Sequence, residues 1–233
     1  KNQQTFLGKT GRFNGEDIID IVVRHPATGR FIATKLYNFF VSDDPAPEEA
    51  IQILAAEYVN SNYDIGSVMR ALLNSKHFKE SFYQKVKSPA EVVASVIRLV
   101  GDYQEPKPGL IDIAYESKYM GQELLNPPTV EGWHTGKEWI DSGSLVGRVN
   151  FASDQLGDLN KEGVKDIVSR ISSSVSYLTA EQLVDGCLDL VGPLVLEDKT
   201  RSTLVDKART AGNIDLSSSG NAGNIEDRVS EML

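Results

Sequence analysis

Apolar residues recur at intervals of three and four along almost the whole chain. Ile32, Leu36, Phe39 and Phe40 fall at positions i, i+4, i+7 and i+8, the spacing of one face of an α-helix. The apolar pair Val22-Val23 is too short to indicate a strand. This pattern predicts an all-α chain, an irregular multi-helix bundle of about nine or ten helices.

Two predicted helices also carry start signals. Ser88-Pro89-Ala90-Glu91 places an N-cap serine, a first-turn proline and a glutamate at the third helical position. These residues together satisfy the free amide groups of a new helix. Thr179 and Gln182 form a second capping box at the start of the helix that carries Cys187.

Composition excludes several classes of protein. A chain of 233 residues that is 40% hydrophobic can bury a full core, as one large or two small domains. Its net charge of -9 repels phosphate backbones, so we predict no nucleic-acid partner. No apolar run approaches the roughly 18 residues of a membrane-spanning helix. The chain begins at Lys1 and ends inside an apparent helix, so we expect a piece of a longer protein.

Motifs that would identify a reaction are missing from the sequence. It has no glycine-rich phosphate loop, no HExxH and no Gly-x-Ser-x-Gly, so we predict no cofactor. The single cysteine, Cys187, has the spacing of a packed core thiol. The three histidines, His25, His77 and His134, are far apart in sequence, and we predict no metal site. These observations do not decide whether the chain is an enzyme.

The segment from Leu124 to Phe151 is the richest in rigid and aromatic residues. It contains two adjacent prolines and both tryptophans, Trp133 and Trp139. In one interpretation the two indoles pack between helices as a plug. In the other they form a platform for a sugar ring or a partner's apolar side chain. The candidate binding residues are Trp133, His134, Trp139, Glu131 and Asp141.

Several short motifs in order resemble a known family. They run from Thr5-Phe6-Leu7-Gly8 and His25-Pro26 through Ser88-Pro89-Ala90-Glu91, and on to Gly121-Gln122, Pro127-Pro128, Gly132-Trp133, Trp139-Ile140 and Arg148-Val149-Asn150-Phe151. This order is similar to the C-terminal half of the bacterial domain-of-unknown-function family DUF1800. The resemblance covers the chain to about residue 160.

The resemblance implies a domain organisation and a location. Residues 1–160 are expected to form a helical domain that resembles the family's C-terminal region. Beyond it, helical periodicity predicts that residues 161–233 add helices on the same core, and the Gly/Ser-rich composition of 212–224 predicts a flexible loop. Family members tend to look exported, which implies a periplasmic or extracellular location. The family has no established activity, and the histidine-rich motifs of its N-terminal half are absent from this chain.

Two functional hypotheses follow from these observations. The first is a helical scaffold or protein-interaction domain of an exported or envelope-associated bacterial protein, with another protein as its partner. The second is part of an envelope hydrolase or carbohydrate-binding enzyme that uses the segment around Trp133 and residues outside this chain. Exposure of Trp133 in a cleft favours the second, and burial of its indole favours the first.

Overall fold

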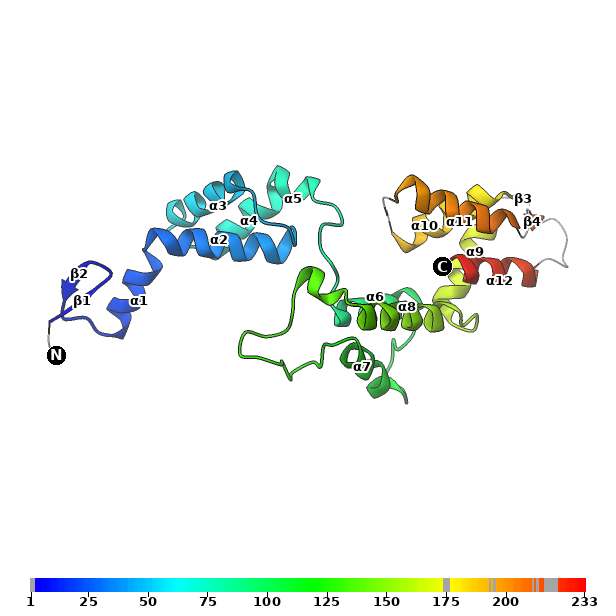
Figure 1. Cartoon of the computed structure of the whole chain (residues 1–233), viewed down its shortest axis with the longest axis horizontal. Coiled ribbons are helices and arrows are strands. Elements are labelled where there is room, and N and C mark those ends of the chain that lie inside the picture. Colours follow the sequence, from blue (N-terminus) through cyan, green and yellow to red (C-terminus); the bar gives the residue numbers. More distant parts are fainter. Residues whose placement is uncertain are drawn as a thin grey trace. The chain divides into compact units, whose positions relative to one another are not determined.

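The computed structural model describes residues 3–173, 177–192, 194, 196–210, 212, 214–215 and 222–233. Within these residues the chain forms twelve α-helices, one short 3-10 helix and four strands of two or three residues (Figure 1). The predicted all-α class is confirmed. The helices outnumber the nine or ten expected because elements as short as α5, Lys76–Glu80, contain too few residues to show a period.

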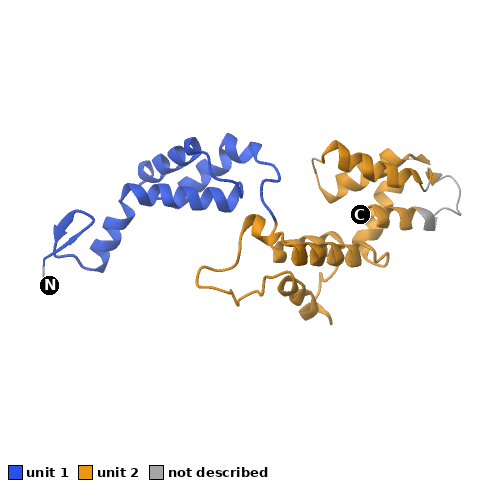
Figure 2. Cartoon of the chain, viewed as in Figure 1, with its two compact units in different colours: residues 1–86 blue, residues 87–233 orange. Residues whose placement is uncertain are grey.

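The chain divides into two compact units, Lys1–Val86 and Lys87–Leu233 (Figure 2). Each unit has its own buried clusters of apolar side chains. The domain boundary expected near residue 160 lies inside the second unit, and the division at that point stays a prediction.

The first unit is a short hairpin followed by five helices. Its elements are β1 (Gln4–Phe6), β2 (Lys9–Gly11), α1 (Gly15–Val23), α2 (Pro26–Phe40), α3 (Glu48–Asn60), α4 (Ile65–Asn74) and α5. The strands are antiparallel, with Gln4 opposite Gly11. Helix α2 begins at the predicted proline, and the Nδ1 atom of its N-cap residue, His25, accepts a hydrogen bond from the amide of Ala27 at 3.2 Å.

Helices α2, α3 and α4 enclose the core of the first unit. Its buried side chains include Ala33, Tyr37, Leu54, Tyr58 and Leu72. The approach of α2 to α3 is close because Gly29 has no side chain: a Cβ atom there would lie 3.0 Å from the Tyr58 ring. The core of this unit is therefore built by residues that fall on one face of each helix.

The second unit contains two groups of helices. The first group is α6 (Pro89–Leu99), α7 (Leu110–Tyr119), the 3-10 helix η1 (Gly136–Trp139) and α8 (Ser142–Leu156). The second is α9 (Glu162–Ser173), α10 (Ala180–Val191), α11 (Asp198–Thr210) and α12 (Ala222–Met232), with strands β3 (Tyr177–Leu178) and β4 (Ile214–Asp215). Both predicted capping boxes are present, at the starts of α6 and α10.

Each group of helices in the second unit has a separate core. Val93, Ile97, Met120 and Phe151 pack together among α6, α8 and the end of α7. A larger cluster holds α9 to α12 together, and its members include Ile171, Leu183, Val184, Cys187 and Val229. A third cluster of Val100, Leu156 and Val164 lies where the two groups meet.

The last helix, α12, is tied to the end of α11 by one buried arginine. The Arg228 guanidinium donates hydrogen bonds to the carbonyl oxygens of Gly212 at 2.7 Å and Ala208 at 2.6 Å. These bonds satisfy carbonyl groups that a helix end leaves without an intrahelical donor. Most of the flexible loop expected at 212–224 lies outside the described residues.

Cys187 is buried in α10, as its spacing predicts, and burial raises the pKa of its thiol to about 12. Because the thiolate is the reactive form, we expect Ellman's reagent to leave Cys187 unmodified in the folded protein at pH 8. In 6 M guanidinium chloride the thiol should react stoichiometrically within minutes. Rapid reaction without denaturant would contradict this burial.

Candidate functional site

Motifs that are distant in the sequence meet at the start of α6. The amide of Ala90 donates a hydrogen bond of 2.8 Å to the side-chain oxygen of Gln122, so the residue after Gly121 caps α6 from outside. One guanidinium nitrogen of Arg148, Nη1, donates to the carbonyl oxygen of Lys87 at 2.9 Å.

Gly121 brings the tryptophan segment close to the same place. Its φ of +97° is a left-handed conformation that glycine adopts readily, and a Cβ atom there would lie 3.9 Å from the ring of Trp139. Trp139 is only 5% exposed. Its carbonyl oxygen accepts a hydrogen bond of 2.6 Å from the Ser144 hydroxyl, which joins η1 to the first turn of α8.

Asp141 is the N-cap of α8. Its carboxylate accepts hydrogen bonds from the amides of Ser144 at 3.0 Å and Gly143 at 2.8 Å. These donors lower the pKa of the Asp141 carboxyl from its usual value, because they stabilise the charged form. The residue predicted to bind a ligand is therefore used to start a helix, and whether it also contacts one stays a prediction.

The role of Asp141 as a cap can be measured. Asp141→Ala should lower the midpoint of thermal unfolding at pH 7, whereas Asp141→Asn should keep most of the stability because Asn is an equally good cap. A carboxyl with a lowered folded-state pKa stabilises the protein above its unfolded pKa and loses that contribution as the pH falls. The Asn variant should thus lose less stability than the native protein between pH 5 and pH 2. Equal losses of stability in the native protein and the Asn variant would contradict this account. The control variant is Asp189→Asn, at an exposed position on α10.

Among the five predicted residues, the structure shows a ring contact between two, His134 and Trp139. The His134 and Trp139 rings meet edge-on, with centroids 6.3 Å apart. The Nδ1 atom of His134 lies 3.1 Å from a carboxylate oxygen of Glu138, a residue that the sequence interpretation missed. The spacing of four residues between His134 and Glu138 was the available signal.

Glu131 and Trp133 lie on and beside a tight turn. The amide of Glu131 donates to the hydroxyl of Thr129 at 3.2 Å, and that hydroxyl donates to the carbonyl of Gly132 at 3.2 Å. The Glu131 side chain is exposed, and Trp133 is partly buried. The indole Nε1 of Trp133 is shielded from solvent and has no hydrogen-bond partner among the described residues. Ligand binding by this turn stays a prediction.

A separate charged cavity of about 290 Å³ lies where α9 begins. Asp102 contacts Lys107 in a short ion pair and lies 3.6 Å from the Nζ of Lys161. The hydrogen bond from Lys107 lowers the pKa of Asp102, against the effect of burial. Asp158 in the same lining accepts hydrogen bonds from the amide and the side chain of Asn160, and Glu162 pairs with Lys165 outside the cavity. The sequence showed only a proline-containing connection at Tyr103–Gly109, because residues 102 and 161 meet through the fold.

The described part of the chain holds its three histidines on separate segments. Within it, no group of three or more His, Cys, Asp and Glu side chains is arranged to hold a metal ion. His25 is the N-cap of α2, His77 lies in α5, and His134 lies shortly before η1. No helix among the described residues is both long enough and apolar enough to cross a bilayer.

Comparison with known proteins assigns the chain to a family. The family model described as protein of unknown function (DUF1800) matches residues 1–222. The match extends beyond residue 160, where the resemblance was expected to end. That the chain corresponds to the family's C-terminal half stays a prediction. No curated protein and no solved structure matches the chain. With nearly its whole length matched, the chain belongs to the DUF1800 family of proteins of unknown function.

Proposed function

We propose that the chain is a helical protein-interaction domain of an exported or envelope-associated bacterial protein. The observation that carries the proposal is the concentration of exposed apolar side chains on α7, α8 and the segment between them. These residues, which we call the apolar face, are Leu110, Ile111, Tyr115, Tyr119, Leu124, Leu125, Val130, Ile140, Leu145, Val146 and Val149.

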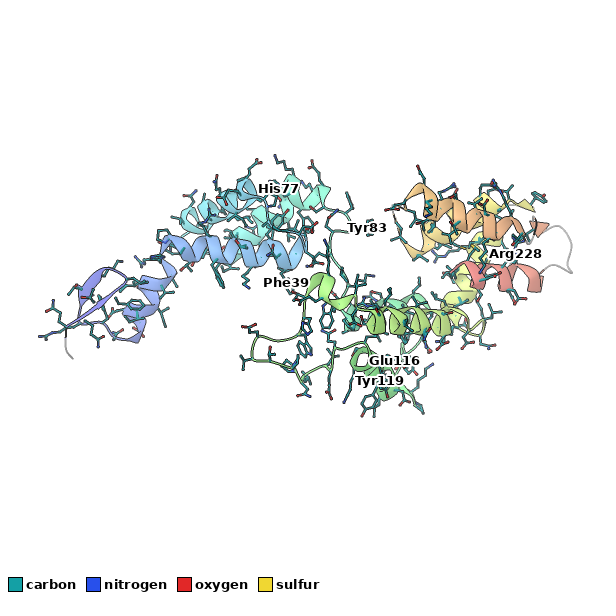
Figure 3. All side chains as sticks on the ribbon, in the orientation of Figure 1. Phe39, His77, Tyr83, Glu116, Tyr119 and Arg228 are labelled. Atoms are coloured by element: carbon teal, nitrogen blue, oxygen red, sulfur yellow. The ribbon has the colours of Figure 1, made fainter. Side chains whose placement is uncertain are left out.

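Helix α7 contributes a row of exposed apolar side chains to the apolar face. Ile111, Tyr115 and Tyr119 follow one another at four-residue intervals on α7, and Tyr119 is 76% exposed (Figure 3). Inward positions of the same helix belong to Ser117, which is 2% exposed, and Ile113, which packs against the core. Helix α7 therefore carries apolar residues on both sides, and only one side is used by the fold.

Beyond α7, the loop side chains are more exposed still. Leu125 is 97% exposed, and Val130 is fully exposed. Contiguous exposed apolar patches are typical of surfaces that bind other proteins, and we propose that these side chains form one. Burial of each large side chain by a partner would contribute about 1.5–3 kcal/mol before the costs of association.

The net charge of -9 supports a protein partner over a nucleic acid. Export is proposed from membership of the family, whose members tend to look exported. Fractionation of the host's cells with an antibody to the chain tests the location, with the periplasm or the medium as the expected fraction. Recovery only with a cytosolic marker would contradict export.

The interaction proposal is tested by quantitative capture from host cells. The chain carrying Ile111→Ser and Tyr119→Ser should retain its far-UV circular dichroism spectrum. The amount of the specific partner polypeptide that it captures should fall at least tenfold. The matched control is Ile53→Ser with Val59→Ser, two exposed apolar residues on α3 of the first unit. Equal loss from both double variants, or loss from neither, would contradict the role of the apolar face.

A second candidate is carbohydrate binding at the turn around Trp133. It is supported by the exposed side chains of Glu131 and His134 beside the partly exposed Trp133. Trp139 is too buried to add a second platform. Oligosaccharides that change tryptophan fluorescence in the native protein and not in Trp133→Phe would favour this function. An unchanged spectrum at millimolar sugar would reject it.

A further inference from the structure

Arg148 has a buried edge that the protein leaves without an acceptor. Its Nη1 is held by the carbonyl oxygen of Lys87. Its Nε and Nη2 are shielded from solvent and have no hydrogen-bond partner among the described residues. Burial lowers the pKa of the guanidinium, while the charge of Asp141 raises it.

An unpaired guanidinium edge is unfavourable inside a protein. Arginine stays charged at any physiological pH, and a buried donor without an acceptor costs about 1–3 kcal/mol, more when it is charged. Such groups in folded proteins are paired with an acceptor or serve a function. The arrangement at Arg148 therefore indicates an acceptor that comes from outside the described contacts.

Two carboxylates at the starts of α6 and α8 accept backbone hydrogen bonds within their own helix caps. Asp141 accepts two amide hydrogen bonds at the start of α8. Glu91 accepts one from the amide of Ser88 at 2.7 Å, within the capping box of α6. Neither forms a hydrogen bond with the Nε or Nη2 of Arg148 in the structure, although the Asp141 charge acts on the guanidinium.

The two free nitrogens share one edge of the guanidinium plane, and their N–H groups point in the same direction. A carboxylate presents two oxygens with the matching separation and plane, which gives a bidentate pair. We propose that the Nε and Nη2 edge of Arg148 binds a carboxylate group from outside this chain, while Nη1 on Lys87 holds the guanidinium in place.

A carboxylate fits this edge better than the other common acceptors. A neutral carbonyl offers one oxygen for two N–H groups and adds no negative charge at the shielded edge. Phosphate carries up to two negative charges into a chain whose net charge is already -9. A carboxylate supplies one charge and two coplanar oxygens. Because the edge is shielded, the atoms that now cover it must move aside when the carboxylate binds.

The test uses the whole chain, labelled with ¹⁵N, and follows the Nε–H resonance of Arg148 by NMR. Through-bond correlation from the arginine side chain assigns the resonance without a variant. The probes are sodium acetate, acetamide and inorganic phosphate at equal pH and ionic strength. Acetate should move the resonance downfield in a saturable manner. No shift with acetate, or an equal shift with acetamide or phosphate, would overturn the proposal.

Two capped peptides identify the source of the carboxylate. N-acetyl-Ala-Glu-Ala-amide offers only a side-chain carboxylate, and N-acetyl-Ala-Ala-Ala offers only a terminal one. Saturable binding of either peptide supports the proposal and names the source, and binding of neither overturns it. In Arg148→Lys, which keeps the charge and loses the paired edge, backbone shifts caused by the bound peptide should weaken at least tenfold. Undiminished binding by that variant would also overturn it.

Discussion

Gly163→Ala is expected to destabilise the second unit by about 3 kcal/mol or more, the upper range for overpacking of a well-packed interior. A Cβ atom at this position would lie 2.2 Å from the carbonyl oxygen of Leu99 and 2.5 Å from the carbonyl carbon of Val100. Both neighbours are backbone atoms, so no side chain can rotate away. The glycine is therefore required where the end of α6 meets the start of α9.

The same contact includes a hydrogen bond, which adds to the expected loss. The amide of Gly163 donates to the carbonyl oxygen of Val100 at 3.0 Å. Relief of the clash would separate these groups and disturb the cluster of Val100, Leu156 and Val164. Guanidinium unfolding followed by tryptophan fluorescence measures the change, because both tryptophans belong to the second unit.

Gly186→Ala is the matched control for this prediction. Gly186 lies inside α10, and a Cβ atom there would meet the side chain of Ile171 at an ordinary 3.6 Å. Alanine is favoured over glycine within a helix by up to about 1 kcal/mol. This variant should be as stable as the native protein or slightly more so. Similar stability of the two variants would show that α6 and α9 do not approach as described.

Leu54→Ala is expected to destabilise the first unit by about 2–5 kcal/mol, the range for removal of a fully buried leucine side chain. Leu54 is 2% exposed and lies at the centre of the core formed by α2, α3 and α4. No tryptophan lies in this unit. Far-UV circular dichroism should therefore show an early loss of helix, while the tryptophan fluorescence midpoint remains unchanged.

Leu156→Ala makes the same chemical change in the second unit, where it should affect the tryptophan signal. Leu156 is 6% exposed in the second unit, which contains both Trp133 and Trp139. Its replacement should shift the fluorescence midpoint to lower denaturant concentration. If both variants moved both signals together, the two units would unfold as one, and the separate cores would not determine stability in the way we describe.

Local signals in the sequence were sufficient to predict most of the helices. The capping boxes at Ser88 and Thr179 were predicted correctly because their hydrogen bonds join residues only three positions apart. Burial of Cys187 was predicted from helical spacing for the same reason. A residue's immediate neighbours decide these features, so no knowledge of the tertiary fold is needed.

Contacts between distant residues could not be predicted in this way. Arg148 meets Lys87 across 61 positions, and Gln122 meets Ala90 across 32. Both pairs depend on how α6 packs against α8 and the end of α7. Asp141 was interpreted as a ligand-binding residue, although an Asp followed three positions later by Ser144 is also the pattern of a helix cap. The binding roles of Trp133, His134 and Glu131 stay predictions.

The most direct test of the interaction proposal places a photo-crosslinking amino acid at Tyr119 in the full chain, expressed in its own host. Asp189, an exposed polar residue on α10, is the control position. Illumination is expected to join one discrete polypeptide to the protein through position 119 and none through position 189. Equal adducts at both positions, or no adduct at position 119, would contradict the assignment of the apolar face as a protein-binding surface.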